Sequence, residues 1–162
     1  MSIFRRRRPE PPKENPYEGL RAMVLGLDPD AAGLPRRGRV WGALLEMTYD
    51  SGSATLVCLA DGSTSLYTST GGGVIGGGDH EEVAAETARF LDAVEEALEA
   101  FGPDPDAALP PPGGAVIRAL THDGRYAVSG PEVDFGEDRH AQSGVFHAAH
   151  RVITLLRLAT GG

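Results

Sequence analysis

Cysteine and lysine are nearly missing from this sequence, and each shortage rules out a class of chemistry. The 162 residues include one cysteine, Cys58, and one lysine, Lys13. A single cysteine cannot form an internal disulfide, and the alternating apolar neighbours of Cys58 are typical of a small buried residue in a reducing compartment. Because no lysine follows residue 13, the rest of the chain has neither a Schiff-base lysine nor a P-loop lysine. The sequence therefore predicts a cytoplasmic protein without lysine-based catalysis.

Long apolar runs are missing as well. No stretch of eighteen consecutive apolar residues occurs, so no membrane-spanning helix is predicted. Prolines and acidic residues follow the basic start of the chain, and no apolar signal-peptide core is expected there. Hydrophobic residues make up 41% of the chain and charged residues 23%, which together with the length favours one globular domain. The richness in Arg, Ala, Gly and Pro suggests a bacterial protein.

Positive charge is scarce except in one place. The chain has a formal charge of −8, yet four of its fifteen basic residues are consecutive: Arg5, Arg6, Arg7 and Arg8. Residues 1–15 contain three prolines and no apolar periodicity, which predicts a disordered tail before a single domain at 16–162. The four arginines are candidates for electrostatic docking onto an acidic partner, a nucleic acid or an anionic lipid surface. Because the whole chain is acidic, nucleic acid is not the expected partner.

The pattern beyond residue 15 predicts three helices and five strands. Apolar residues at helical spacing predict helices over 16–27, 80–101 and 142–159. Alternating stretches predict strands at 39–49, 53–60, 63–70, 115–122 and 125–130. Asp61-Gly62 and Asp123-Gly124 each fit the two-residue turn of a β-hairpin. Three strands are thus expected to form a meander and two to form a hairpin.

The patterns also predict which residues share a face. In the first strand, one face is expected to hold Trp41, Ala43, Leu45, Met47 and Tyr49. The middle helix is expected to begin at an Asp79 cap and to bury one stripe: Val83, Thr87, Phe90, Leu91, Val94, Leu98 and Phe101. The last helix is expected to bury Phe146, Ala149, Val152, Ile153, Leu156 and Leu158. The proline-rich connector at 103–114 is expected to contain neither helix nor strand.

The order of these elements, α-βββ-α-ββ-α, favours an α+β fold over a parallel βαβ sheet. We expect a single five-stranded antiparallel sheet with the helices packed on one face. In element content the chain resembles the profilin-like or roadblock-like class of small sheet-and-helix modules. This resemblance is limited to element content and assigns no site residue.

A glycine-rich run precedes the middle helix. It consists of Gly71, Gly72, Gly73, Val74, Ile75, Gly76, Gly77 and Gly78. Gly71, Gly73 and Gly76 have the spacing of a dinucleotide-binding loop, but the preceding strand belongs to a meander rather than to a βαβ unit. The acidic residues that follow would also repel a phosphate at the helix N-terminus. Glycines beside a strand often allow another backbone to approach, so we predict an interaction surface centred on Val74 and Ile75.

Three histidines lie near the C-terminus, and two of them are candidate metal ligands. His147 and His150 are three residues apart on the predicted last helix, a spacing that lets both face one ion. Arg151 and Arg157 share the polar side of that helix and oppose a divalent cation, so no metal site is predicted. Cys58 has apolar neighbours and no obvious base, and no G-x-S-x-G elbow occurs. We expect no cofactor.

These patterns predict a small cytoplasmic bacterial protein that acts as a non-catalytic interaction or adaptor module. Its partner would be another protein or a second copy in a homodimer, with the run at 71–78 as the contact surface. The alternative is a small-anion or nucleotide-binding protein, with or without enzymatic activity, that uses the same glycine turn and the C-terminal histidines. A third hypothesis is electrostatic docking through Arg5 to Arg8, which predicts strongly salt-dependent binding.

Overall fold

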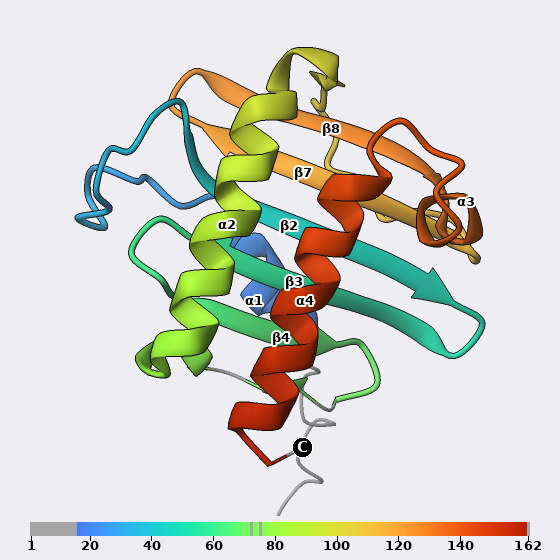
Figure 1. Cartoon of the computed structure of the whole chain (residues 1–162), viewed down its shortest axis with the longest axis horizontal. Coiled ribbons are helices and arrows are strands. Elements are labelled where there is room, and N and C mark those ends of the chain that lie inside the picture. The colour runs from blue at the N-terminus through green and yellow to red at the C-terminus, as the bar shows by residue number, and fades with distance from the viewer. Residues whose placement is uncertain (1–15, 72, 75, 162) are drawn as a thin grey trace, which may run out of the picture.

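The computed structural model describes residues 16–71, 73, 74 and 76–161, which form an α+β fold (Figure 1). The expectations for residues 1–15 lie outside the described residues. The helices are α1 (Pro16–Leu25), α2 (Glu81–Ala97), α3 (Glu132–Gly136) and α4 (Ser143–Ala159), with 3-10 turns η1 (Gly77–Asp79) and η2 (Leu98–Ala100). The strands are β2 (Val40–Tyr49), β3 (Gly52–Leu59), β4 (Thr64–Thr68), β5 (Gly73–Val74), β6 (Gly102–Pro103), β7 (Gly114–Thr121) and β8 (Gly124–Pro131).

The strands form one antiparallel sheet in the order β5-β4-β3-β2-β7-β8-β6. The predicted α+β class, the antiparallel sheet and its five long strands are confirmed, but the predicted strand number was too low. The two additional strands, β5 and β6, lie at opposite edges and have two residues each. Two residues cannot show an alternating pattern, so no periodicity could predict these strands. The short helix α3 was also not predicted.

The two long helices cover one face of the sheet, whereas α1 lies on the other (Figure 1). The larger hydrophobic cluster joins α2 and α4 to the sheet through residues such as Phe90, Val152 and Leu45. A smaller cluster on the opposite face includes Tyr17 and Val24 of α1. The prediction that the helices pack on one face was therefore wrong for α1. The central strand β2 is buried from Val40 to Met47, so both of its faces need a cover.

A β-bulge changes the face on which the only tryptophan lies. Val40 pairs with Thr121 but Gly42 pairs with Leu120, so the register between β2 and β7 shifts at this point. Trp41 consequently packs in the smaller cluster rather than with Ala43 in the larger one. The prediction of a common face for Trp41 and Ala43 was wrong, because regular alternation does not continue across a bulge.

The two long helices match their predicted spans closely, and two details differ. All seven residues of the predicted stripe are buried, five of them in α2, with Leu98 in η2 and Phe101 just after it. The N-cap of α2 is His80 rather than Asp79, because η1 occupies Gly77–Asp79. On α4, Leu158 is 74% exposed and was wrongly assigned to the core. Within the part of the chain described, no helix is both long and apolar enough to cross a membrane.

Candidate functional site

Two residues of the glycine run form the outermost strand of the sheet, next to β4. Gly73 and Val74 form β5, which pairs with Tyr67 and Leu66 of β4. Gly72 and Ile75 lie outside the described residues. Among the described residues, these two pairs join β5 to β4, which has five residues from Thr64 to Thr68.

Two glycines of the run lie where a side chain has no room. A Cβ atom at Gly77 would meet the Leu156 side chain, and one at Gly78 would lie 2.5 Å from the carbonyl oxygen of Gly62. Gly71 and Gly76 differ, because both have positive φ angles, 101° and 83°, and no described residue lies within 4 Å of a Cβ position at either. The run therefore combines two open, left-handed positions with two positions that allow close contact within the chain.

The N-terminus of α2 follows this run without a side-chain cap. His80 occupies the N-cap position and its side chain makes no capping hydrogen bond. Glu81 and Glu82 are in the first turn. Their carboxylates favour the positive end of the helix dipole themselves, so an anion approaching the same amides would be repelled.

The C-terminal histidines make separate contacts. His147 Nε2 lies 2.8 Å from Asp138 Oδ1, whereas the His150 ring packs against Phe146 with 4.5 Å between ring centroids. His140 caps the outer edge of β8: its Nε2 donates to the Ser129 carbonyl oxygen at 3.2 Å, while Nδ1 accepts the backbone N–H of Gln142. Among the residues described, no group of three or more His, Cys, Asp or Glu side chains could hold a metal ion.

His147 and His150 line a cavity of about 610 Å³ together with Glu86, Arg151, Thr154 and Leu155. Arg151 Nε lies 3.3 Å from Glu86 Oε2, so part of its charge is already neutralised. Among the described residues of the glycine run, none lines this cavity. The cavity therefore does not join these glycines to the histidines.

The burial of His150 is expected to make the stability of the protein depend on pH. Its Nε2 is buried and has no hydrogen-bond partner among the described residues. Burial lowers the pKa of His150 below the usual 6.5, whereas the nearby Glu132 opposes this shift. His150 therefore binds a proton more readily in the unfolded chain than in the folded protein. The free energy of unfolding consequently falls as the pH drops below about 6.5. In denaturant titrations between about pH 8 and 5, His150→Gln should show a smaller loss of stability than the wild type. Equal losses in both proteins would contradict a buried neutral histidine.

Cys58 lies in the core beneath α2. Its side chain is fully buried, and burial raises the pKa of its thiol to about 12 despite a contact from Thr87. A thiolate is therefore scarce near neutral pH, which disfavours nucleophilic or redox chemistry at this residue.

A buried ionic cluster lies on the α1 face of the sheet and was not predicted from the sequence. Its centre is Glu46 on β2, whose side chain is fully buried. Arg21 of α1 donates to Glu46 Oε2 at 2.7 Å, and Arg118 of β7 donates to Glu46 Oε1. Thr55 also donates to Glu46 and accepts the hydroxyl of Tyr17, whose pKa burial raises. Every side chain of this cluster therefore has a partner of complementary charge or hydrogen-bonding capacity.

The same arginines hold the proline-rich connector against the sheet. Arg21 donates to the carbonyl oxygen of Ala107, and Arg118 donates to that of Ala108. Arg118 Nε also lies 2.8 Å from Asp104 Oδ2. Further along, Gly113 donates its N–H to the Thr48 carbonyl oxygen at 2.8 Å. Both ends of the connector are thus fixed, with the prolines between them.

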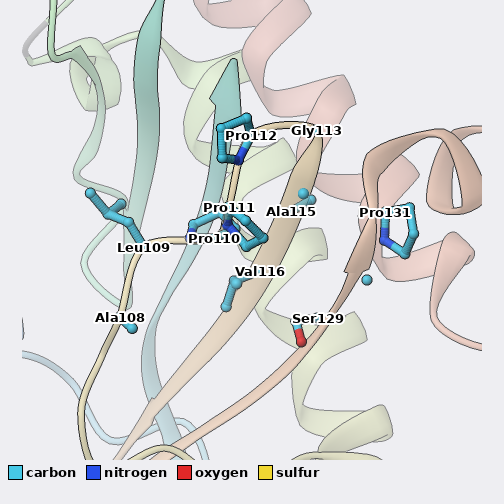
Figure 2. Close-up of a pocket in the computed structure, with 12 residues that line it drawn as sticks. Ala108, Leu109, Pro110, Pro111, Pro112, Gly113, Ala115, Val116, Ser129 and Pro131 are labelled. Atoms are coloured by element: carbon cyan, nitrogen blue, oxygen red, sulfur yellow. The ribbon is translucent and has the colours of Figure 1, made fainter. Parts of the chain in front are cut away.

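This arrangement creates an apolar groove beside the connector (Figure 2). The groove has a volume of about 490 Å³. Its walls and floor come from Ala108, Leu109, Pro110, Pro111, Pro112, Gly113, Gly114, Ala115, Val116, Ser129, Gly130 and Pro131. No charged side chain is among them, and residues 110–112 are prolines, which have no backbone N–H to offer. The groove is therefore stiff, apolar and held in place by buried charges.

One feature of the sequence could have predicted the ionic cluster, although no prediction was based on it. Glu46 and Arg118 are single charges within otherwise apolar strands, and both lie on the face opposite the larger core. A charge in such a strand is usually solvated, and only the position of α1 shows that these two are covered.

In comparisons with known proteins, no family model matches the chain and no curated protein matches it.

Proposed function

We propose that this protein is a non-catalytic interaction or adaptor module of the bacterial cytoplasm. Its contact surface would be the sheet edge formed by residues 71–78. A protein partner, or a second copy in a homodimer, would add its backbone to this edge. The observation that supports the proposal is the position of β5 as the outermost strand at this end of the sheet, where it pairs with Leu66 and Tyr67 of β4.

The conformation of the run supports this role. Strand edges with free peptide groups pair readily with other chains, and proteins usually blunt them with charge, proline or a cover. The run at 71–78 contains no charge and no proline. Gly77 and Gly78 fix one end of the run against Leu156 and Gly62, while Gly71 and Gly76 leave open space beside the backbone. A partner strand would therefore meet an anchored backbone with few side chains in its way.

The test replaces the two apolar residues of the run, Val74→Asp and Ile75→Asp, in one variant. We expect weaker self-association in analytical ultracentrifugation, or loss of the partner in quantitative affinity purification from the native host. Added carboxylates at a strand edge disfavour pairing with another strand. The matched control is Val133→Asp, because Val133 is an apolar residue of α3 that is 52% exposed.

The edge proposal fails if the double variant and the wild type have the same oligomeric state and the same partners. The second candidate, binding of a small anion or nucleotide, is favoured by Arg151, His147 and His150 around one cavity. In that case the edge substitutions would have no effect, and phosphate or ATP would raise the melting temperature of the wild type.

A further inference from the structure

We propose that the apolar groove beside the connector binds the N-terminal segment of its own chain, with Ile3 and Phe4 as the apolar anchor. This inference is independent of the sheet edge at 71–78. It rests on the position of the groove relative to the start of α1, on the length of the preceding segment, and on the charge of both parts.

The groove and the start of α1 lie on the same face of the sheet. Thr55, Glu46, Val116 and Ser129 pair directly across β3, β2, β7 and β8, so they form one row with side chains on a common face. Tyr17, the second residue of α1, binds Thr55 at one end of this row with an O–O distance of 2.7 Å. Val116 and Ser129 line the groove at the other end.

The N-terminal segment is long enough to cross this distance. Neighbouring strands are about 4.8 Å apart, so the three steps from Thr55 to Ser129 cover roughly 14 Å. Eleven residues separate Phe4 from Pro16 in the sequence. Even a partly extended chain of this length spans more than this, because full extension would reach roughly 40 Å. The segment can therefore enter the groove without disturbing α1.

The chemistry of the segment matches the groove and its surroundings. Ile3 and Phe4 are adjacent apolar residues, and the groove is lined by apolar side chains and prolines. Residues 1–15 contain five basic and two acidic residues, a charge of +3, whereas the remaining chain has ten basic and twenty-one acidic residues, a charge of −11. Asp106 and Glu132 lie within two residues of the groove lining in sequence. Arg5 to Arg8 would therefore approach a domain of opposite net charge behind the apolar anchor.

The test measures access to the groove in the full-length chain. Ser129→Cys places a thiol in the groove, where Ser129 is exposed, and the native Cys58 is buried. We expect iodoacetamide to label this thiol at least about threefold more slowly when residues 3 and 4 are native than when both are changed to Asp, since protection follows occupancy. Thr154→Cys, on the exposed side of α4, is the control. Its thiol should be labelled at the same rate whether residues 3 and 4 are native or changed to Asp.

Three outcomes separate the occupants. Protection that is independent of protein concentration and weaker in about 1 M salt supports docking within one chain, because screening removes the contribution of the arginines. Protection that grows with protein concentration would assign the groove to the tail of a second copy and overturn the proposal. Equal labelling of Ser129→Cys with native and substituted tails would also overturn it.

Discussion

Replacing Glu46 with leucine is expected to lower the free energy of unfolding by about 3–5 kcal/mol, the usual cost of leaving a buried charge without its partner. Glu46 is fully buried, and it accepts hydrogen bonds from both Arg21 and Arg118. Arg118 is only 2% exposed, so water cannot replace the lost carboxylate, and Asp104 alone would remain as its acidic partner. For a chain of this length the change corresponds to a melting temperature lower by about 10 °C. Chemical denaturation followed by circular dichroism measures it.

Two further variants separate a buried ion pair from a generally sensitive position. Removing both partners, as in Glu46→Leu with Arg118→Met, should cost less than the sum of the two single changes, because neither charge is then left alone. The exposed pair of Arg36 and Asp30, with an N–O distance of 3.5 Å, is the surface comparison, and Asp30→Asn should have little effect. Strict additivity in the double variant would show that the two side chains are not coupled.

The position of the ionic cluster also explains how the irregular connector can form one side of the apolar groove. The connector has prolines but no helix or strand at residues 104–113, so its own backbone makes few regular hydrogen bonds. The guanidinium groups of Arg21 and Arg118 donate hydrogen bonds to two carbonyl oxygens of the connector. Glu46 holds both guanidinium groups in place. Weakening Glu46 therefore affects the groove as well as the stability of the sheet.

Local patterns predicted the elements of this fold well. Asp61-Gly62 and Asp123-Gly124 lie where β3 turns into β4 and β7 into β8, so the positions of both hairpins were predicted correctly. The predicted turn type was wrong, because neither aspartate has a positive φ and Gly124 already pairs with Thr121 in the sheet. The long helices α2 and α4 were found because their apolar stripes extend over several turns. In each case the decisive information lies within a few residues of sequence.

The features that were missed depend on residues far apart in the sequence. The bulge at Trp41 results from pairing with β7, about eighty residues away, and periodicity within β2 carries no trace of it. The place of α1 on the opposite face follows from the need to cover Leu44 and Val57, whose burial becomes known only with the sheet order. The groove requires both the connector and the α1 face. Candidate sites were therefore harder to predict than the elements that carry them.

Replacing Gly78 with alanine is expected to lower the free energy of unfolding by about 1–3 kcal/mol, the range for overpacking a close contact. A Cβ atom at this position would lie 2.5 Å from the Gly62 oxygen and 3.0 Å from Ser63 Cα. Both are backbone atoms of the turn between β3 and β4, so they cannot rotate away as the end of a side chain can. Gly78 has no positive φ, which means that the cost comes from contact rather than from backbone conformation.

Gly144→Ala provides the same substitution without the contact. Gly144 lies in α4 and has no neighbour within 4 Å of a Cβ position, so alanine there should raise the free energy of unfolding by up to about 1 kcal/mol. If the free energy of unfolding falls for Gly78→Ala and rises for Gly144→Ala, η1 needs a glycine at position 78 because it contacts the β3–β4 turn. If Gly78→Ala is instead as stable as the wild type, that turn moves aside at little cost. The anchored end of the run at 71–78 would then be a flexible one, and a partner strand would meet a backbone that is not fixed in advance.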